Sequence, residues 1–330
     1  SRYLLRRCVE KMEIVSQETA AFWKHVLRHH RSQVTVSRRY WTFTAIARCM
    51  DYRRIPFPKD FILDFPPEEE AEAQGHLHRM GLAGKPYVCI YARDNGWNKA
   101  FKGELGSSYQ CHDDARNFDV EDYRAAVGRL AARGLWSVRM GRAVERPFEG
   151  DFVVDYATRY RTEMMDFYLL AHCRFFVCTN SGIFAIAMLF RTPMVWVNAA
   201  VLSQCTDAVP PLTPKRDLMI PQKYWSRQEG RYLGAREMLA FENAHPDYGI
   251  YDAYARAGIE IRKNTPEEIA DVAMEMEDRL AGRRTYTPEE EALQDRYREI
   301  LMDAVEENHF LYLDARVGTE FLKQNPWFLE

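Results

Sequence analysis

Apolar residues between positions 85 and 200 form short runs that alternate with segments of helical periodicity. The runs are apolar at most positions, as expected for strands buried on both faces of a sheet. They are PYVCIYA (86–92), LWSVRMG (135–141), DFVVDYA (151–157), RFFVCT (174–179) and PMVWVNA (193–199). Helices are expected between them at 120–134, 164–173 and 181–190. This alternation predicts a parallel, doubly wound α/β sheet.

The residues before position 85 have a different pattern. Residues 1–50 are expected to form two helices, and residues 53–70 an extended linker that contains four prolines. A further helix is expected to begin at Pro67, because proline and the acidic residues that follow it favour a first helical turn. These observations predict an N-terminal helical segment and linker over 1–80.

The pattern loosens again after position 200. The Pro-rich stretch 202–225 predicts a long loop or lid. Helices are expected over 264–282, with Thr265 as N-cap, and from Pro288 to about Glu307. The predicted organisation is therefore a Rossmann-like nucleotide-binding domain over 81–285, followed by C-terminal helices over 286–330.

Composition narrows the class of protein. The 330 residues are 47% hydrophobic and 28% charged, as in ordinary globular proteins, and carry a net charge of −3. A general nucleic-acid binder would have a basic excess, so no nucleic-acid partner is expected. No apolar run approaches the roughly 20 residues that span a bilayer. A cytoplasmic protein is expected. Whether it makes peripheral contact with the inner face of the membrane is left open by the sequence.

Two further features concern the environment of the chain and its start. The seven cysteines include no C-x-x-C pair, and several lie within apolar strands, which favours reduced, buried thiols. The first residues, SRYLLRRCVEKME, mix charge into every turn and do not form a signal peptide. Because the chain does not begin with Met, we expect that it starts inside a longer product or after a tag.

Polar and charged residues follow each predicted strand. In an open parallel sheet, ligands bind beyond the carboxyl ends of the strands, so these residues are expected to converge on one rim. They are Arg93, Asp94 and Asn95 after the first strand, Arg139 in the second, Asp155 and Tyr156 in the third, Thr179, Asn180, Ser181 and Gly182 after the fourth, and Asn198 in the fifth. Arginines, aspartates and a hydroxyl-rich turn together suit a nucleoside diphosphate.

Each of these groups also has a purely structural interpretation. Arg93 and Asp94 could form a local surface ion pair. Arg139 lies between apolar residues and needs an anionic partner, either a ligand or a carboxylate of the protein. Asp155 and Tyr156 could cap the next segment. The turn from Thr179 to Gly182 could be a phosphate cradle or a plain helix cap.

Other common site motifs are absent. The sequence has no G-x-x-x-x-G-K-[ST], no G-x-G-x-x-G and no G-x-S-x-G, which argues against a P-loop, a dinucleotide fingerprint and an α/β-hydrolase. His25, His29 and His30 share a predicted helix but lack a third ligand in register. No metal site and no cofactor are expected.

Six segments carry a resemblance to a known family. They are ARDN (92–95), ARNFDVEDY (115–123), RGLWSVRMGR (133–142), VVDYA (153–157), DFYLLAHCRFFVCTNSG (166–182) and ARVGTEFLKQNPWFL (315–329). From about residue 60 to the C-terminus, the sequence resembles bacterial glycosyltransferases associated with surface polysaccharide synthesis. More distantly, it is similar to the donor-binding half of fucosyltransferase-like GT-B enzymes.

The resemblance implies a role for each residue of the rim. Arg93 would hold the donor diphosphate, with Asp155 and Tyr156 near the nucleoside. Thr179, Ser181 and Gly182 would cradle phosphate at the helix start. The fucosyltransferase-like pattern has His two residues before the arginine, where this chain has Tyr91. The identity of the donor therefore does not transfer, and the N-terminal part looks short for a full acceptor domain.

GT-B enzymes stabilise the leaving diphosphate with protein cations and helix dipoles instead of a metal. The expected function is therefore metal-independent, inverting transfer of a sugar from a nucleotide-sugar donor to a glycan or lipid-linked acceptor. Asp94 is the expected base, and other carboxylates in or near the same loop are Glu104, Asp113 and Asp114. Two alternatives stay open: a nucleotide-sugar epimerase of the same architecture, and a non-catalytic subunit that binds nucleotide sugars in polysaccharide assembly.

Overall fold

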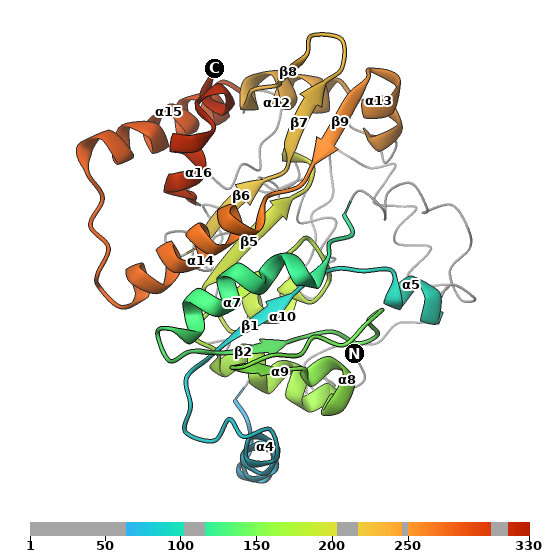
Figure 1. Cartoon of the computed structure of the whole chain (residues 1–330), viewed down its shortest axis with the longest axis vertical. Helices are drawn as coiled ribbons and strands as arrows, with labels where there is room; N and C mark the ends of the chain where they lie inside the picture. Colours follow the sequence, from blue (N-terminus) through green and yellow to red (C-terminus); the bar gives the residue numbers. More distant parts are fainter. Residues whose placement is uncertain (1–63, 102–115, 203–216, 246–249, 305–315) are drawn as a thin grey trace, which may run out of the picture. The chain divides into compact units, whose positions relative to one another are not determined.

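The centre of the fold is a seven-stranded parallel sheet (Figure 1). The computed structural model describes residues 64–101, 116–202, 217–245, 250–304 and 316–330. In chain order the strands are β1 (Tyr87–Tyr91), β2 (Trp136–Arg139), β3 (Val153–Val154), β4 (Phe176–Cys178), β5 (Met194–Ala199), β6 (Leu218–Pro221) and β10 (Arg316–Val317). The prediction of an α/β fold with a parallel sheet is confirmed.

The order of the strands is that of a doubly wound sheet. Across the sheet it reads β10-β6-β5-β4-β1-β2-β3, and every neighbouring pair is parallel. From β1 the chain winds outward through β2 and β3, then crosses back to β4 and winds the other way. The topological switch point, where ligands of such sheets bind, therefore lies between β1 and β4.

Helices cover both faces of the sheet. The expected helix at 120–134 is a 3₁₀ turn, η4 (Val120–Tyr123), followed by α7 (Arg124–Ala131). Between β3 and β5 the chain forms α8 (Tyr156–Arg159), α9 (Glu163–His172) and α10 (Phe184–Leu189). The β1–α7–β2 and β4–α10–β5 units run in opposite directions across the sheet. Because such crossovers are right-handed, α7 and α10 lie on opposite faces (Figure 1).

Burial on both faces explains the continuous apolar runs. All six residues of β5, all three of β4 and the first four of β1 are buried. Three cysteines belong to this core, and each is buried and outside any disulfide: Cys89, Cys173 and Cys178. Burial raises the pKa of the Cys89 and Cys178 thiols well above the usual range, so both stay protonated. The other four cysteines lie outside the described residues.

The prediction of a loop or lid over 202–225 is wrong in its second half. Residues 218–226 form β6 and β7 (Lys223–Ser226), and β7 pairs antiparallel with β8 (Arg231–Tyr232) and β9 (Ile259–Arg262) in a second, small sheet. Four-residue strands are too short to show a period, and Pro221 lies at the end of β6, where strands tolerate proline. The first half of the stretch, 203–216, lies outside the described residues.

The remaining helices surround the two sheets. Helix α4 begins at Pro67, as expected, and the N-cap hydroxyl of Thr265 accepts a hydrogen bond from the Glu268 N–H, as predicted for α14. The helices are α4 (Pro67–Arg79), α5 (Gly96–Phe101), α12 (Ala235–Ala244), α13 (Ile250–Arg256), α14 (Pro266–Leu280), α15 (Pro288–Ala304), α16 (Thr319–Gln324) and the 3₁₀ turn η5 (Pro326–Leu329). The described residues from 64 to 330 all belong to one compact unit, and the two helices expected over 1–50 lie outside the described residues. The domain limits expected at 80 and 285 stay predictions.

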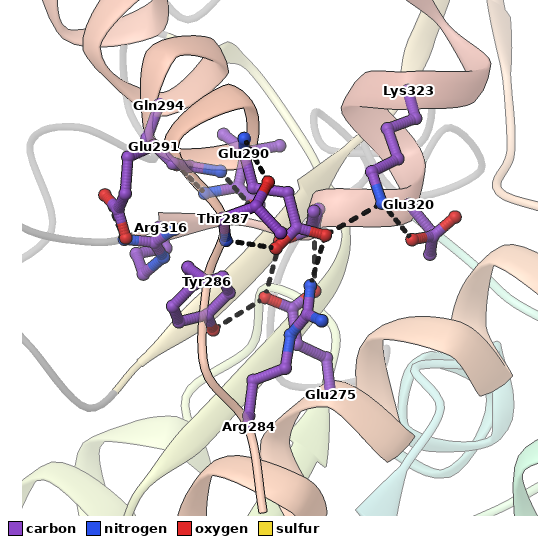
Figure 2. A network of polar contacts seen from close by, with 12 residues as sticks. Glu275, Arg284, Tyr286, Thr287, Glu290, Glu291, Gln294, Arg316, Glu320 and Lys323 are labelled. Atoms are coloured by element: carbon purple, nitrogen blue, oxygen red, sulfur yellow. Dashed lines mark hydrogen bonds and ion pairs between the residues drawn. The ribbon is translucent and has the colours of Figure 1, made fainter.

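A network of polar contacts holds the C-terminal helices to the sheet (Figure 2). At its centre is Glu290, whose carboxylate accepts hydrogen bonds from Lys323 (2.8 Å), Arg284 (2.8 Å) and the Thr287 N–H (3.1 Å). Burial alone would raise the pKa of Glu290, but these three donors outweigh it and lower the pKa to about 2. The carboxylate therefore joins α15 to α16 and to the α14–α15 connection.

Replacing Glu290 with Gln is expected to lower the free energy of unfolding at pH 7 by about 2 kcal/mol, the scale of hydrogen bonds to a buried charge. The folded pKa lies below the value of about 4.3 for an unfolded glutamate, so this contribution is complete above that value and disappears as pH falls toward 2. Urea unfolding of both proteins from pH 7 to pH 3 should show the difference shrink. A difference that is constant across this range would contradict the proposed role of the charge.

Candidate functional site

The two segments on either side of the switch point meet directly. The strand register pairs Tyr91 of β1 with Cys178 of β4, so Arg93 and Thr179 follow at the same edge. The Arg93 N–H donates a hydrogen bond to the Thr179 hydroxyl oxygen (3.3 Å). Asn180 extends the connection to β5, because its side-chain oxygen accepts a hydrogen bond from the Ala200 N–H (3.2 Å). The polar turn therefore ties together the carboxyl ends of β1, β4 and β5.

The interpretation of this turn as a plain helix cap is wrong. Helix α10 begins at Phe184, its N-cap residue is Ile183, and no side chain caps it. The polar side chains lie two to four residues earlier, where Thr179 and Asn180 bond to neighbouring loops. With six residues, α10 is also too short for its dipole to define a phosphate site.

Ser181 and Gly182 leave hydrogen-bonding capacity and space at the turn. The Ser181 hydroxyl is buried beside the Tyr91 phenol, yet it forms no well-made hydrogen bond with any described residue. A Cβ built on Gly182 would meet no atom within 4 Å, so the space above this residue is open. A buried hydroxyl without a partner is costly unless something else supplies one. Ser181 is thus the residue of the turn that most needs a ligand.

The sequence left open whether Arg139 pairs with a ligand or with a carboxylate of the protein, and the structure shows two protein carboxylates beside it. Its side chain is fully buried and pairs with Asp155 (Nη1 to Oδ1, 3.4 Å) and Asp94 (Nη2 to Oδ2, 3.5 Å). Burial lowers the pKa of Arg139, while the carboxylates of Asp155 and Asp94 oppose that shift. These three residues are called here the buried hub. Arg139 therefore anchors the loops after β1 and β3.

Asp94 is held by two backbone N–H groups in addition to Arg139. Its Oδ1 accepts a hydrogen bond from the Gly96 N–H (2.9 Å), and its Oδ2 accepts one from the Glu145 N–H (3.0 Å). The two loops are packed so closely that a Cβ on Gly96 would lie 2.6 Å from the Val144 backbone. A substrate proton would have to compete with these bonds for the same oxygens. The geometry suits a positioning role for Asp94 better than that of a base.

Asp155 and Tyr156 are directed into the protein. Asp155 Oδ2 accepts hydrogen bonds from the Phe148 N–H (3.0 Å) and the Thr158 hydroxyl (2.6 Å). The buried Tyr156 hydroxyl lies 2.7 Å from the Thr162 carbonyl oxygen and 2.9 Å from Asp166 Oδ1. Burial, together with the nearby Asp166 carboxylate, raises the pKa of Tyr156, so its phenol stays neutral. The expected contact of Asp155 and Tyr156 with a nucleoside stays a prediction, and their hydrogen bonds to protein groups do not support it.

The structure therefore divides the predicted rim into two groups. Arg93, Thr179, Asn180, Ser181 and Gly182 gather at the switch point, whereas Arg139, Asp94 and Asp155 form the buried hub. Asn198, which was also expected at the rim, exchanges hydrogen bonds with Asn264: each backbone N–H donates to the other side-chain oxygen at 2.6 Å. Asn198 thereby fixes the end of β5 to the start of α14.

Asn95, which was expected at the rim, belongs to a group of asparagines whose other members, Asn98 and Asn117, sequence reasoning did not identify. Asn95 Oδ1 accepts hydrogen bonds from Asn117 Nδ2 (2.7 Å) and Asn98 Nδ2 (3.4 Å). The adjacent Phe118 N–H donates to the Arg93 carbonyl oxygen (2.7 Å), which brings the second segment against the β1 loop. Asn95 and Asn117 belong to the motifs ARDN and ARNFDVEDY, but their spacing of 22 residues gave no sign that they meet.

Metal ligands and membrane-spanning segments were not expected from the sequence. Across the described ranges, no group of three or more His, Cys, Asp or Glu side chains is placed to hold a metal ion. No helix within the same ranges has the length and apolar character that crossing a membrane requires. The candidate carboxylates Glu104, Asp113 and Asp114 and the histidines His25, His29 and His30 lie outside the described residues.

Comparisons of the chain with models of protein families, with curated proteins and with solved structures find no match.

Proposed function

We propose that the chain is a glycosyltransferase that moves a sugar from a nucleotide-diphosphate donor to a glycan or other acceptor. The observation that supports this most is the position of Arg93 and the Thr179–Gly182 turn on the two sides of the switch point between β1 and β4. Ligands of open α/β sheets bind in this crevice. The Arg93 guanidinium and the Ser181 hydroxyl are suitable donors for the oxygens of a diphosphate.

In the proposed reaction, an acceptor hydroxyl oxygen forms a bond to the anomeric carbon as the bond from that carbon to the diphosphate breaks. Negative charge develops on the departing diphosphate oxygen, and the Arg93 guanidinium stabilises it without a metal. The acceptor proton passes to a carboxylate. Asp94, the base expected from the sequence, positions the β1 loop in this proposal, which leaves Glu104, Asp113 and Asp114 as candidates for the base.

A second candidate is a non-catalytic subunit that binds a nucleotide sugar. Asp94 and Asp155 are the two carboxylates predicted for the rim that the structure describes. Both bind Arg139 and backbone N–H groups, which favours a protein without a catalytic carboxylate at this point. Incubation with a nucleotide sugar separates the two functions. Release of nucleoside diphosphate that increases with an added acceptor supports the transferase, and binding without turnover supports the subunit.

Replacing Ser181 with Ala is expected to weaken binding of nucleoside diphosphate without lowering stability. The hydroxyl makes no well-formed hydrogen bond with the described residues, so its removal costs the folded protein little. Loss of one hydrogen bond to a charged ligand should cost about 1.5–3 kcal/mol, or roughly 10- to 100-fold in dissociation constant. Calorimetric titration with UDP, GDP, ADP and dTDP measures the affinity, and urea unfolding measures the stability.

Thr179 provides a matched control for the stability measurement, because its hydroxyl lies in the same turn but has a protein partner. Its hydroxyl oxygen accepts the Arg93 N–H, so Thr179→Val should lower the free energy of unfolding by about 1 kcal/mol. If Ser181→Ala binds nucleotide as tightly as the wild-type protein does, the Ser181 hydroxyl is not a phosphate ligand.

A further inference from the structure

The Asn95 side chain is held in a defined orientation at the edge of the candidate site. Two amide nitrogens, from Asn117 and Asn98, donate to its Oδ1, and its backbone oxygen accepts a hydrogen bond from the Lys99 N–H (2.9 Å). An amide whose oxygen is fixed by two donors cannot rotate freely about its terminal bond. Its nitrogen is therefore oriented in advance, which lowers the entropy cost of binding a ligand.

The nitrogen of this amide remains available. Asn95 is half-buried, and its Nδ2 makes no hydrogen bond with any residue in the described part of the chain. A fully buried nitrogen without a hydrogen bond would be an unsatisfied polar atom, and this nitrogen is not one, so solvent reaches it. The result is a pair of N–H donors, accessible and oriented, two residues beyond Arg93 on the loop that borders the switch point.

The charge beneath this amide disfavours an anion. The buried hub combines one guanidinium with the carboxylates of Asp94 and Asp155, which leaves a formal charge of −1 under the loop. This charge favours a neutral hydroxyl or ring oxygen over an anion at Asn95, whereas the Arg93 guanidinium on the same loop is the better partner for a phosphate. Amide N–H groups donate readily to hydroxyl and ring oxygens.

The neighbouring exposed side chain has matching chemistry. Trp97, on the first turn of α5, is 39% exposed and is one of three large apolar side chains with high exposure in the described ranges. Sugars present C–H groups on the faces of their rings and oxygens at the edges, so a site with both amide donors and aromatic surface suits them.

We propose that the Asn95 amide nitrogen binds the sugar of the nucleotide-sugar donor by hydrogen bonds to its hydroxyl oxygens, beside the diphosphate held at Arg93. This inference rests on the proposed function and adds to it a sugar subsite on the β1 side of the switch point. Asn98 and Asn117 orient the amide, and Asn95 makes the contact.

The test compares each nucleoside diphosphate with its sugar conjugate. The probes are UDP and UDP-glucose, GDP and GDP-mannose, ADP and ADP-glucose, and dTDP and dTDP-glucose, titrated calorimetrically into the full chain. Wild-type protein should bind at least one conjugate more tightly than its parent diphosphate. Asn95→Ala should leave the affinity for that diphosphate within about twofold and weaken the conjugate roughly 3- to 10-fold.

A second substitution separates the donor role from effects on folding. Asn95→Asp keeps the Oδ1 acceptor for Asn98 and Asn117 but replaces the N–H donors with an oxygen. The added negative charge affects binding of a nucleoside diphosphate and binding of its sugar conjugate alike. Any further loss of affinity that only the conjugate shows therefore measures the contribution of the amide N–H donors. Thermal unfolding checks that both variants are folded.

The outcomes distinguish this inference from the proposed function. If a diphosphate binds, but wild type and the Asn95 variants have the same affinity for its sugar conjugate, the sugar subsite alone is overturned. Equal affinity of wild type for every diphosphate and its conjugate also overturns the subsite alone. Failure of every probe to bind overturns both the subsite and the proposed function.

Discussion

Replacing Arg139 with Met should lower the free energy of unfolding by about 3–5 kcal/mol, the cost of removing one partner from a buried ionic cluster. The guanidinium is fully buried between Asp94 and Asp155. Methionine fills much of the same volume but leaves the buried Asp155 carboxylate and the half-buried Asp94 carboxylate without their common cation. Urea unfolding at pH 7 measures the loss. Arg227→Met is the matched control, because Arg227 pairs with Glu260 at an exposed position, where about 0–1 kcal/mol is expected.

A double substitution tests whether the charges are the cause. Adding Asp155→Asn to Arg139→Met removes one of the two stranded carboxylates, so the double variant should be more stable than the sum of the two single losses implies. Simple additivity of the two losses would contradict the description of Arg139 as the cation of the buried hub.

The pattern of apolar positions was sufficient for the main sheet and insufficient for the small one. Strands buried on both faces, such as β4 and β5, leave a continuous apolar run that sequence reasoning can find. Local chemistry also identified the start of α14, since Thr265, Pro266 and Glu268 form a capping box that needs no tertiary contact. By contrast, β7, β8 and β9 are only two to four residues long, and β7 depends on pairing with the distant β9 as well as with β8, its neighbour in a short hairpin.

The candidate site shows a different limit. Sequence reasoning placed polar residues at the carboxyl ends of strands, and the structure brings Arg93 and Thr179 together there. It could not tell which side chains the protein uses for itself. Asp155 and Tyr156 have the composition of ligand-binding residues, but their partners are Phe148, Thr158, Thr162 and Asp166. That distinction depends on side-chain direction, which strand periodicity does not specify at a strand end.

Arg93 is the residue on which the proposed chemistry depends most. Arg93→Lys should reduce the rate of sugar transfer by about 10²- to 10³-fold, the range for losing a donor to a developing oxyanion. Donor affinity should fall by much less, because lysine keeps the positive charge but loses the two-pronged geometry of the guanidinium. Steady-state kinetics with a donor and its acceptor separates the two effects. Arg174→Lys is the control, because Arg174 precedes β4 at the opposite edge of the sheet and pairs with Glu277.

The central claim is that the switch point between β1 and β4 binds a nucleoside diphosphate without a metal. The most direct measurement is the unfolding temperature and free energy of wild type and Arg93→Ala with UDP, GDP, ADP, CMP and dTDP, in buffer that contains EDTA. At about 100 times its dissociation constant, a diphosphate should stabilise the wild-type chain by roughly 2.7 kcal/mol and the variant by much less. No stabilisation by any of the five nucleotides, equal stabilisation of the two proteins, or stabilisation that appears only when Mg²⁺ or Mn²⁺ replaces EDTA would contradict the account.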